Sequence, residues 1–424
     1  MAKIWKVFAG TLIVAAALGL SGCGSNGSAN NSGGQAQQGE APAESAKQKV
    51  TVWHYFDNNT RQGFEDAIAQ FNASQDKYEV VPQYVPFANM KKQLSIGLAA
   101  GNDLPDLIQL DNPDHASFSA MGTFEDLTGR IQEWGQADKF FEGPLNSTIY
   151  EGKYYGLPIS SNCLALFYNK DMFAEAGIAE LPKTWDELRK VAKQLTKGDR
   201  YGFAISAVKS EEGTFQFLPW LLSAGANYDS LDTPEAIKAM DFLTSLVKDG
   251  SMSKEVINWE QSDVEKQFAA GKAAMMVNGP WNIAQVKADA PNMNWGIALL
   301  PIDKKHASVL GGENIAIVKG KNVDGAWAFI TWLLEPSHFE KFITTTGYFP
   351  PRKDVAEQSE FWRSDPNLKV FSDQLASAMP RGPHPKWPQI SEAIQEAIQK
   401  SLTLHDSPEA SMKEAAEKVN AILK

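Results

Sequence analysis

The chain has 424 residues, and its 51 Asp and Glu against 40 Lys and Arg give a formal net charge of −11 at pH 7. A net acidic protein is a poor partner for nucleic acid, and we exclude that class of function. The chain has only two cysteines, which argues against a fold held together by a disulfide framework. Its length is sufficient for two lobes, each with an apolar core of its own.

The first 22 residues have the pattern of an export signal. A basic start is followed by the uncharged, largely apolar run Val7–Leu20 and by small residues before Cys23, an order typical of a secretory signal peptide. The apolar run has 14 residues, fewer than the roughly 20 that a membrane-spanning helix needs. The tetrapeptide LSGC that ends at Cys23 resembles the bacterial lipobox. This resemblance implies that residues 1–22 are removed and that Cys23 carries a lipid anchor.

The segment after the signal is predicted to be a flexible tether. Residues 23–48 are rich in Gly, Ser, Asn and Gln and have little apolar surface to bury. A disulfide between Cys23 and Cys163 is the alternative, but it would staple this tether to the folded body. We expect Cys163, inside the apolar run CLALFY, to be a buried free thiol instead.

The body begins with alternating strands and helices. Strands are expected at residues 49–56, 78–84 and 106–111, where β-branched and aromatic residues gather. Between them, apolar residues recur at helical spacing around Phe64 and Met90. The pattern predicts a βαβαβ unit, which forms a mostly parallel sheet covered by helices.

The second half also mixes helices with short strands. One helix is expected after Thr184, with Glu187 placed to complete a capping box, and another after Thr233. A short buried strand at residues 273–277 precedes a helix that opens at Pro280, and two helices close the chain. The fold class predicted for both halves is therefore α/β.

Sequence signatures of enzymes are missing. The sequence contains no G-x-S-x-G, no phosphate-binding P-loop and no H-E-x-x-H, and its six histidines lack metal-ligand spacing. We therefore assign no catalytic residue, metal or cofactor. A glycosidase-like carboxylate pair stays open, because such a pair is defined by its separation in space.

Polar and aromatic residues follow several of the predicted strands. In open α/β sheets, ligands bind beyond the carboxyl ends of strands. Candidates at these positions are His54, Tyr55, Asp57, Asp111, Asn112 and Trp281. An aromatic face with surrounding carboxylates and amides suits a sugar ring, which has an apolar face and a polar edge. A core role for Trp281, and loop-capping roles for Asp57 and Asp111, are the alternatives.

Seven motifs along the body resemble the extracellular solute-binding proteins of ABC importers, the family that includes maltose-binding and other sugar-binding proteins. In order they are VTVWHYF, DLPDLIQLD, YEGKYYGLPIS, ALFYNKDMFAEAGI with PKTWDEL, FAAGKAAMMVNGPW, GGENIAIVKG and GYFPPRKD. The resemblance implies a periplasmic-binding-protein-like fold of two α/β lobes around a ligand cleft. The chain would cross the hinge about three times, near GLPIS, VLGGE and TTGYF. The lobes would comprise residues 49–158 plus 311–343 and residues 159–310 plus 344–424.

The same resemblance implies a set of ligand-binding residues. They are His54, Tyr55, Asp57, Asp111, Asn112, Asn162, Trp281, Gly312, Glu313 and Arg352, together with Trp220 by a looser match. Two positions depart from the maltose-binding pattern, because Asn162 stands where that protein has an acidic residue and Leu110 where it has a tryptophan. Maltodextrin is therefore not the expected ligand.

The expected function is capture of a mono- or oligosaccharide and its delivery to the membrane subunits of an ABC permease. Glycerol-3-phosphate or a related phosphodiester is the alternative, with Arg352 as the anion partner, and a lipid-anchored glycosidase is a third hypothesis. We expect a monomer on the outer face of a cytoplasmic membrane. A Gram-positive surface is favoured, and a periplasm-facing lipoprotein is the alternative.

Overall fold

The computed structural model describes residues 46–382 and 384–424. The predicted signal peptide, Cys23 and most of the predicted tether lie outside these residues. No helix in the described part of the chain is long and apolar enough to cross a membrane.

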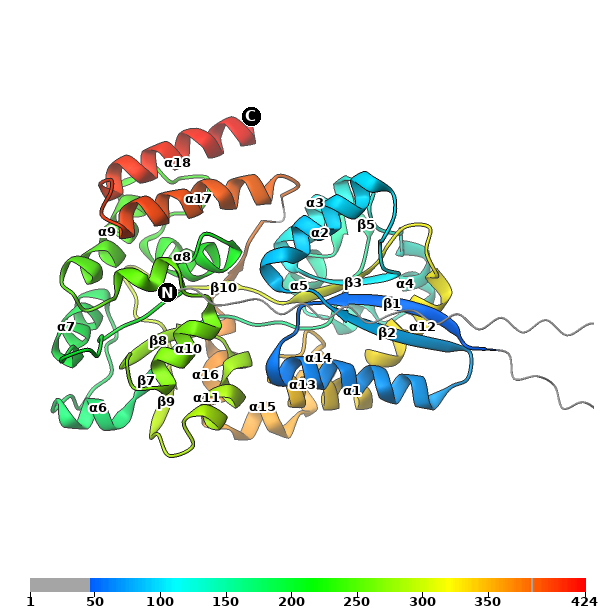
Figure 1. The fold of residues 1–424 in the computed structure, drawn as a ribbon, viewed down its shortest axis with the longest axis horizontal. Coiled ribbons are helices and arrows are strands. Elements are labelled where there is room, and N and C mark those ends of the chain that lie inside the picture. Colours follow the sequence, from blue (N-terminus) through cyan, green and yellow to red (C-terminus); the bar gives the residue numbers. More distant parts are fainter. Residues whose placement is uncertain (1–45, 383) are drawn as a thin grey trace, which may run out of the picture. The chain divides into compact units, whose positions relative to one another are not determined.

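The first lobe is built on a five-stranded sheet in the order β2-β1-β3-β11-β6 (Figure 1). Strand β1 pairs in parallel with β2 and β3, which confirms the predicted βαβαβ unit. Strand β11 comes from much later in the chain and runs antiparallel to both β3 and β6. The bounds are β1 (Gln48–His54), β2 (Tyr78–Tyr84), β3 (Leu107–Asp111), β6 (Leu157–Pro158) and β11 (Glu313–Ile317).

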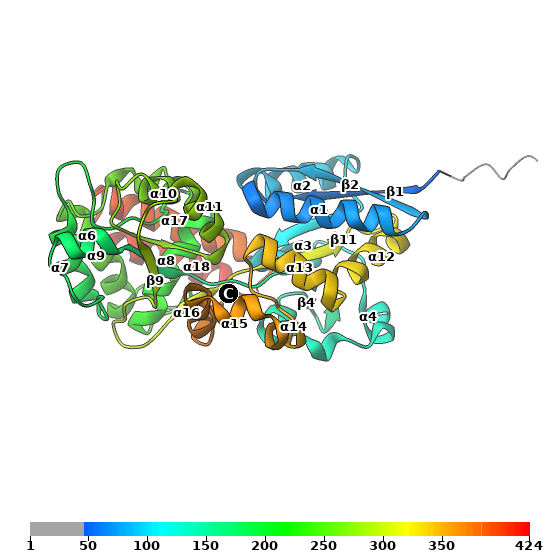
Figure 2. The same ribbon diagram turned by 90° about the horizontal axis from the view of Figure 1, so that it is seen from below.

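Helices cover both faces of this sheet because side chains of β1 alternate between two apolar clusters. Val50 and Val52 pack in one cluster with Phe64 of α1, whereas Trp53 packs in another with Met90 of α2. Figure 2 shows α1 and α13 side by side. The helices are α1 (Asn58–Ser74), α2 (Phe87–Ala100), α3 (Asn112–Ala120), α4 (Thr128–Trp134), α5 (Glu142–Asn146), α12 (Val323–Leu333), α13 (Pro336–Thr346) and α14 (Lys353–Gln358).

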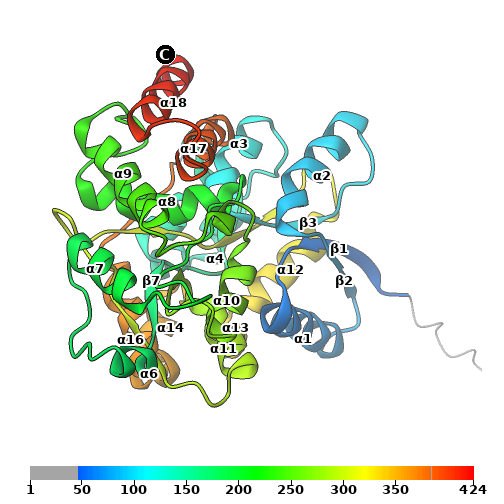
Figure 3. The same cartoon turned by 60° about the vertical axis from the view of Figure 1, so that its left-hand side comes forward.

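The second lobe has a smaller sheet in the order β8-β7-β9, in which both outer strands run antiparallel to β7. Its strands are β7 (Ala165–Asn169), β8 (Met275–Asn278) and β9 (Trp295–Ala298). Helices surround this sheet, and α17 and α18 lie together against α9 (Figure 3). These helices are α6 (Lys170–Glu175), α7 (Trp185–Leu195), α8 (Glu211–Ala224), α9 (Pro234–Lys248), α10 (Gln261–Ala269), α11 (Ile283–Asp289), α15 (Glu360–Ser364), α16 (Pro366–Leu375), α17 (Trp387–Leu402) and α18 (Pro408–Leu423).

The helix starts predicted in this lobe are confirmed. The Thr184 hydroxyl accepts a hydrogen bond from the backbone N–H of Glu187, whose carboxylate accepts the N–H of Thr184 in return. The Thr233 hydroxyl accepts the backbone N–H of Ala236 and caps α9 by this single bond, with Pro234 in the first turn. Both caps satisfy N–H groups that a helix leaves without partners at its start.

Three segments of the chain connect the lobes and lie side by side. Asn162 pairs with Gly311, and the neighbouring Ser161 pairs with Phe349, so all three expected crossings meet in one small ladder. Gly312 has φ +136°, and a Cβ there would lie 2.4 Å from the carbonyl oxygen of Ser160. Only glycine fits this close crossing.

The lobe limits stay a prediction. Helix α13 runs past the expected limit at residue 343 as far as Thr346 and packs against α1 of the first lobe, and Arg352, expected in the second lobe, bonds to Gln136 and Leu334 of the first. Cys163, close to the first crossing, is a buried free thiol as expected.

Candidate functional site

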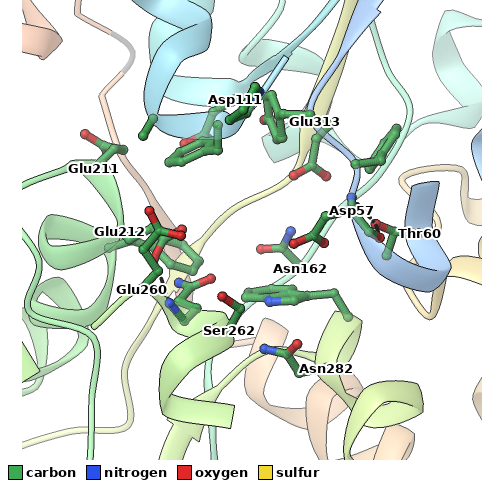
Figure 4. A pocket seen from close by; sticks show the side chains of 18 of the residues that line it. Asp57, Thr60, Asp111, Asn162, Glu211, Glu212, Glu260, Ser262, Asn282 and Glu313 are labelled. Carbon is green, nitrogen blue, oxygen red and sulfur yellow. Dashed lines mark hydrogen bonds between the residues drawn. The ribbon is translucent and has the colours of Figure 1, made fainter. Parts of the chain in front are cut away.

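A pocket of about 960 Å³, including its solvent-open part, is lined by residues of both lobes. The first lobe contributes residues that follow β1 and β3, and the second contributes the starts of α8 and α10 and the turn after β8. Parallel strands β1 and β3 end at the same edge of their sheet, which brings residues far apart in sequence into one place. Figure 4 shows carboxylates reaching into this pocket from two sides.

Seven of the eleven residues expected in the cleft line this pocket. They are Tyr55, Asp57, Asp111, Asn162, Trp281, Gly312 and Glu313. Tyr55, Asp57, Asp111 and Trp281 were expected from strand ends, and Asn162, Gly312 and Glu313 from the family resemblance; the structure brings both sets to one pocket. Their contact with a ligand stays a prediction.

His54 and Asn112 lie beside the pocket but not in its lining. The side chain of His54 shares the face of β1 that carries Val52, so it points beneath α1, where its ring lies 5.2 Å from that of Phe64. Burial lowers the pKa of His54 to about 4, so the ring is neutral at pH 7. Asn112 is the first residue of α3 and is buried.

Trp220 is a core residue, which corrects the expected cleft position. Its side chain is 1% exposed. Its ring centre lies 5.2 Å from that of Phe242 and 5.9 Å from that of Trp185, inside the second lobe. Helix α8 is buried nearly all round, and it presents Phe215 to the pocket instead.

The expected cleft position of Arg352 is also corrected, because this residue is buried in the first lobe away from the pocket. Its guanidinium donates to both carboxylate oxygens of Asp354, at 3.0 and 2.7 Å. It also donates to Gln136 Oε1 at 2.8 Å and to the carbonyl oxygen of Leu334 at 2.9 Å. With these bonds made, Arg352 has a structural role at the third crossing and no free donor face for an anion in the cleft.

The basic residue of the pocket is Arg381, which sequence reasoning missed. Its guanidinium makes a two-point pair with Asp111 at 2.7 and 2.6 Å and donates to Glu211 Oε1 at 2.9 Å. The Phe215 ring lies beneath it, 4.4 Å from Cζ. Asp111 belongs to the first lobe and Glu211 to the second, so Arg381 bridges the two. Arg381 follows a three-residue strand, β12 (Ala378–Pro380), which no sequence pattern marks.

Burial outweighs pairing for the acidic partner of Arg381. The pKa of Asp111 is raised by its burial, although the charge of Arg381 acts in the opposite direction. Burial would lower the pKa of Arg381, but the carboxylates of Asp111 and Glu211 raise it above its ordinary value. Glu211 is held in turn by the indole N–H of Trp387, at 3.1 Å, and by the Ser391 hydroxyl.

Two further carboxylic acids of the pocket have strongly raised pKa values. Burial raises the pKa of Glu313 to about 8, against the hydrogen bond that the Ser160 hydroxyl donates to its carboxylate. Burial also raises the pKa of Glu212 to about 8, and the nearby charges of Glu260 and Asp57 add to the shift. Both groups hold a proton at neutral pH and can then donate as well as accept a hydrogen bond.

Trp281 forms an aromatic wall of the pocket. It is partly exposed, and its ring lies between those of Phe215 and Tyr348, with 6.3 Å to each ring centre. A Cβ on Gly279 would meet the Trp281 ring at 1.9 Å. The glycine of the NGPW motif is therefore required for the ring to fold back over the chain.

Some buried polar atoms of the pocket lining have no partner within the protein. They include Asn162 Oδ1 and Arg381 Nε. Such groups are costly to bury without a hydrogen bond, so they are natural contacts for a ligand. Among the described residues, no three His, Cys, Asp or Glu side chains are grouped to hold a metal ion.

Comparisons with known proteins give this pocket a family context. The sequence model of a family described as bacterial extracellular solute-binding protein matches residues 66–370. The maltotriose-binding protein of Pyrococcus abyssi is 28% identical over 398 residues, covering 89% of this chain and 83% of that protein. The sn-glycerol-3-phosphate-binding periplasmic protein of Escherichia coli is 26% identical over 416 residues, covering 88% of this chain and 92% of that protein.

A solved structure agrees over its whole length. An ABC transporter solute-binding protein of Thermotoga lettingae, bound with alpha-D-tagatose, matches with a TM-score of 0.83 and 30% identity, covering 89% of this chain and 100% of that one. Its two-lobe architecture and the long family match lead to one conclusion: this chain belongs to the bacterial extracellular solute-binding protein family.

Proposed function

We propose that the protein is the sugar-binding component of an ABC importer, which captures a mono- or oligosaccharide between its lobes and delivers it to a membrane permease. The observation that carries this proposal is the pocket itself, where the aromatic face of Trp281 is surrounded by carboxylates and amides from both lobes. A sugar ring presents C–H groups on its faces and hydroxyls around its edge, so it needs this combination.

Each group has a proposed part in binding. Trp281 packs against a ring face, Asp57 and Asn162 accept hydrogen bonds from hydroxyls, and Arg381 donates through its free Nε. Asp111 and Glu313 line the side of the pocket opposite Trp281, next to the crossing at Gly312. The ligand favours the closed arrangement only by the contacts that it makes with both lobes at once.

The relatives support a carbohydrate ligand and delivery by a permease, without catalysis. Maltotriose and tagatose appear in the names of two proteins similar to this chain. The sn-glycerol-3-phosphate-binding relative keeps the phosphate alternative under consideration. Against it, Arg352 is committed to Asp354, and the pocket sets six carboxylic acids against one guanidinium. A phosphate dianion would meet net repulsion there.

We also propose that the protein is a monomer, anchored through Cys23 to the outer face of a cytoplasmic membrane. The lipobox-like sequence before Cys23 supports the anchor, and the family description supports an extracellular location. A Gram-positive surface is the first choice, and a periplasmic face is the alternative. Replacement of Cys23 by alanine should release the protein or leave its signal uncleaved, without changing ligand affinity.

A thermal-shift screen of the purified protein tests the ligand class. A ligand present at a hundred times its Kd stabilises the folded state by about 2.7 kcal/mol, which raises Tm measurably. We expect at least one sugar at millimolar concentration to raise Tm and glycerol-3-phosphate to have no effect. A shift with the phosphate ester alone would overturn the sugar proposal. Release of new products from an oligosaccharide, followed by chromatography, would overturn the non-enzymatic role.

A further inference from the structure

The six carboxylic acids that line the pocket fall into two groups. Asp111 and Glu211 share Arg381, and Glu313 is hydrogen-bonded by Ser160. The other three, Asp57, Glu212 and Glu260, are called the acidic trio here. Among the described residues, no Lys, Arg or His side chain lies within ion-pair distance of any of the trio.

The acidic trio spans the gap between the lobes. Asp57 follows β1 in the first lobe, whereas Glu212 lies in the first turn of α8 and Glu260 comes just before α10, both in the second. Figure 4 shows Glu212 and Glu260 next to each other and Asp57 across from them. Backbone N–H groups are the hydrogen-bond partners of these carboxylates: Glu212 accepts from Gln261 at 2.8 Å, and Asp57 and Glu260 each accept from the first turn of the helix that they cap.

The charges near the trio do not neutralise it. Arg381 is the one basic side chain among the described residues of the lining, and Asp111 and Glu211 already engage it. With six acidic side chains and one guanidinium, the lining has a formal balance of −5, which the protons held by Glu212 and Glu313 at neutral pH reduce to −3. Lys266 is the cation whose charge reaches Asp57, but its amine pairs with Asp263 at 3.1 Å.

A second, independent feature points to a ligand rich in donors. Asn162 is 4% exposed, and its Oδ1 has no hydrogen-bond partner in the protein. It lines the same pocket from the first lobe crossing. The backbone of Asn162 is paired in the ladder that joins the lobes and its side chain is buried, so Oδ1 needs a donor from whatever fills the pocket.

Closure of the lobes over a neutral ligand would remove water from the acidic trio and return no positive charge. Burying unpaired carboxylates is costly, which is why Glu212 holds a proton when no cation is near, and a neutral sugar supplies at most hydroxyl donors. An ammonium group supplies three N–H donors and a full positive charge. We infer that the natural ligand is a sugar with a free, positively charged amino group, which binds between Asp57 of one lobe and Glu212 and Glu260 of the other. This inference depends on the proposed sugar-binding function.

The test compares sugars that differ only at the amino group. Isothermal titration at pH 6.5 and low salt would measure glucosamine against glucose and N-acetylglucosamine, and galactosamine and mannosamine against their neutral parents. The β-1,4-linked glucosamine disaccharide is compared with cellobiose in the same way. We expect an amino sugar to bind about tenfold or more tightly than its neutral counterpart, with a preference that shrinks in 0.5 M NaCl.

Two variants and a control locate the effect. Glu212→Gln and Glu260→Gln each keep the side-chain shape and should reduce the preference for the amino sugar severalfold, with little change in the affinity for a neutral sugar. Glu392→Gln makes the same replacement at an exposed position on α17 and should leave the preference unchanged. Thermal unfolding of each variant confirms that it is folded before titration.

The outcomes separate this inference from the function that it rests on. If neutral sugars bind as tightly as their amino counterparts, the inference is wrong and the sugar-binding function stands. If the preference is present but survives in both variants, the acidic trio is not its source and the inference is wrong. If no sugar of either kind binds, the proposed function falls and the inference falls with it.

Discussion

Two buried arginines, Arg352 and Arg381, have similar partners and opposite roles. Each makes a two-point pair with an aspartate, yet the pKa of Asp354 is lowered, chiefly by its hydrogen bond with Arg352, whereas the pKa of Asp111 is raised by burial. The side chain of Asp354 is 28% exposed and that of Asp111 is 8% exposed. Ion pairing therefore stabilises a carboxylate that water still reaches, and burial dominates where water is excluded.

This difference separates a structural arginine from a site arginine. Arg352 has its donors satisfied inside one lobe and ties the third crossing to it. Arg381 keeps a free Nε and is shared between acids of the two lobes. A buried donor without a partner is costly, so we expect Nε of Arg381 to contact the ligand.

The largest effect is expected for Arg381→Met. The change leaves Asp111 and Glu211 buried without a cation, and breaking a buried pair in this way costs about 3–5 kcal/mol of unfolding free energy. Ligand affinity should fall by at least about a hundredfold as the bridge between the lobes disappears. Denaturant unfolding and titration calorimetry measure the two effects. Sugar binding that survives in folded Arg381→Met would show that Arg381 is not part of the site.

Arg352→Met should cost less stability and spare the ligand. Asp354 can turn to water once its partner is gone, so we expect a loss of about 1–3 kcal/mol. The affinity of the folded protein for its sugar should change less than about twofold, because Arg352 makes no contact with the pocket. The same two measurements apply. If folded Arg352→Met lost its affinity for the sugar, Arg352 would contribute to ligand binding, and its assignment as a structural residue would be wrong.

The raised pKa of Glu313 predicts a pH effect of intermediate size. Its folded-state pKa of about 8 exceeds the ordinary value of 4.5, so the folded protein binds the extra proton between these values and loses this stability as pH rises through 8. Below pH 6.5, the lowered pKa values of His54 and His115 act in the opposite direction.

The window from pH 6.5 to 8.5 therefore isolates the carboxylic acids. We expect Tm of the ligand-free protein to fall across this pH window. The loss of the Glu313 proton lowers the free energy of unfolding by at most about 1.4 kcal/mol per pH unit. Glu313→Gln should flatten the fall, and Asp354→Asn should leave the slope unchanged because its lowered pKa lies far below the window. Equal slopes for Glu313→Gln and the unmodified protein would contradict the assignment.

The smallest effect is expected for Phe215→Leu. The Phe215 ring beneath the Arg381 guanidinium contributes a cation–π contact of about 1 kcal/mol, which leucine cannot make. Affinity for the ligand should weaken a few fold, and chemical denaturation should report a similarly small loss. Phe140→Leu, beneath Arg352, is the matched change in the other region and should leave affinity unaltered.

Much of the fold was predictable because its signals are local. The strand-helix alternation from residue 49, the capping box at Thr184 and the glycine of the NGPW motif all depend on residues a few positions apart. Tyr55, Asp57 and Asp111 follow from one rule of parallel sheets, that their carboxyl ends share an edge, whereas Asn162, Gly312 and Glu313 were implied by the family resemblance.

The site residues that the sequence analysis assigned wrongly or did not find also have a common cause. Trp220 and Phe215 lie five positions apart on one helix, and only packing decides which of them faces the pocket. Arg352 stands in a recognisable motif and Arg381 in none, yet only Arg381 meets Asp111, 270 residues earlier in the chain. Strand β11 pairs antiparallel within the first sheet although the chain has passed through the second lobe before it. No periodicity in the sequence predicts this pairing.

The amino-acid sequence by itself determined the class of this protein: an exported, acidic, two-lobed α/β chain whose strand ends carry polar and aromatic groups. The acidic charge, the α/β alternation and the polar strand ends follow from composition, periodicity and spacing, which act over short distances, and the arrangement in two lobes was implied by the family resemblance. Tertiary structure decided which arginine serves the pocket, which tryptophan is exposed, and that three carboxylates face one another without a cation. Such pairings join groups hundreds of residues apart, so they are settled by packing and by the cost of burying charge.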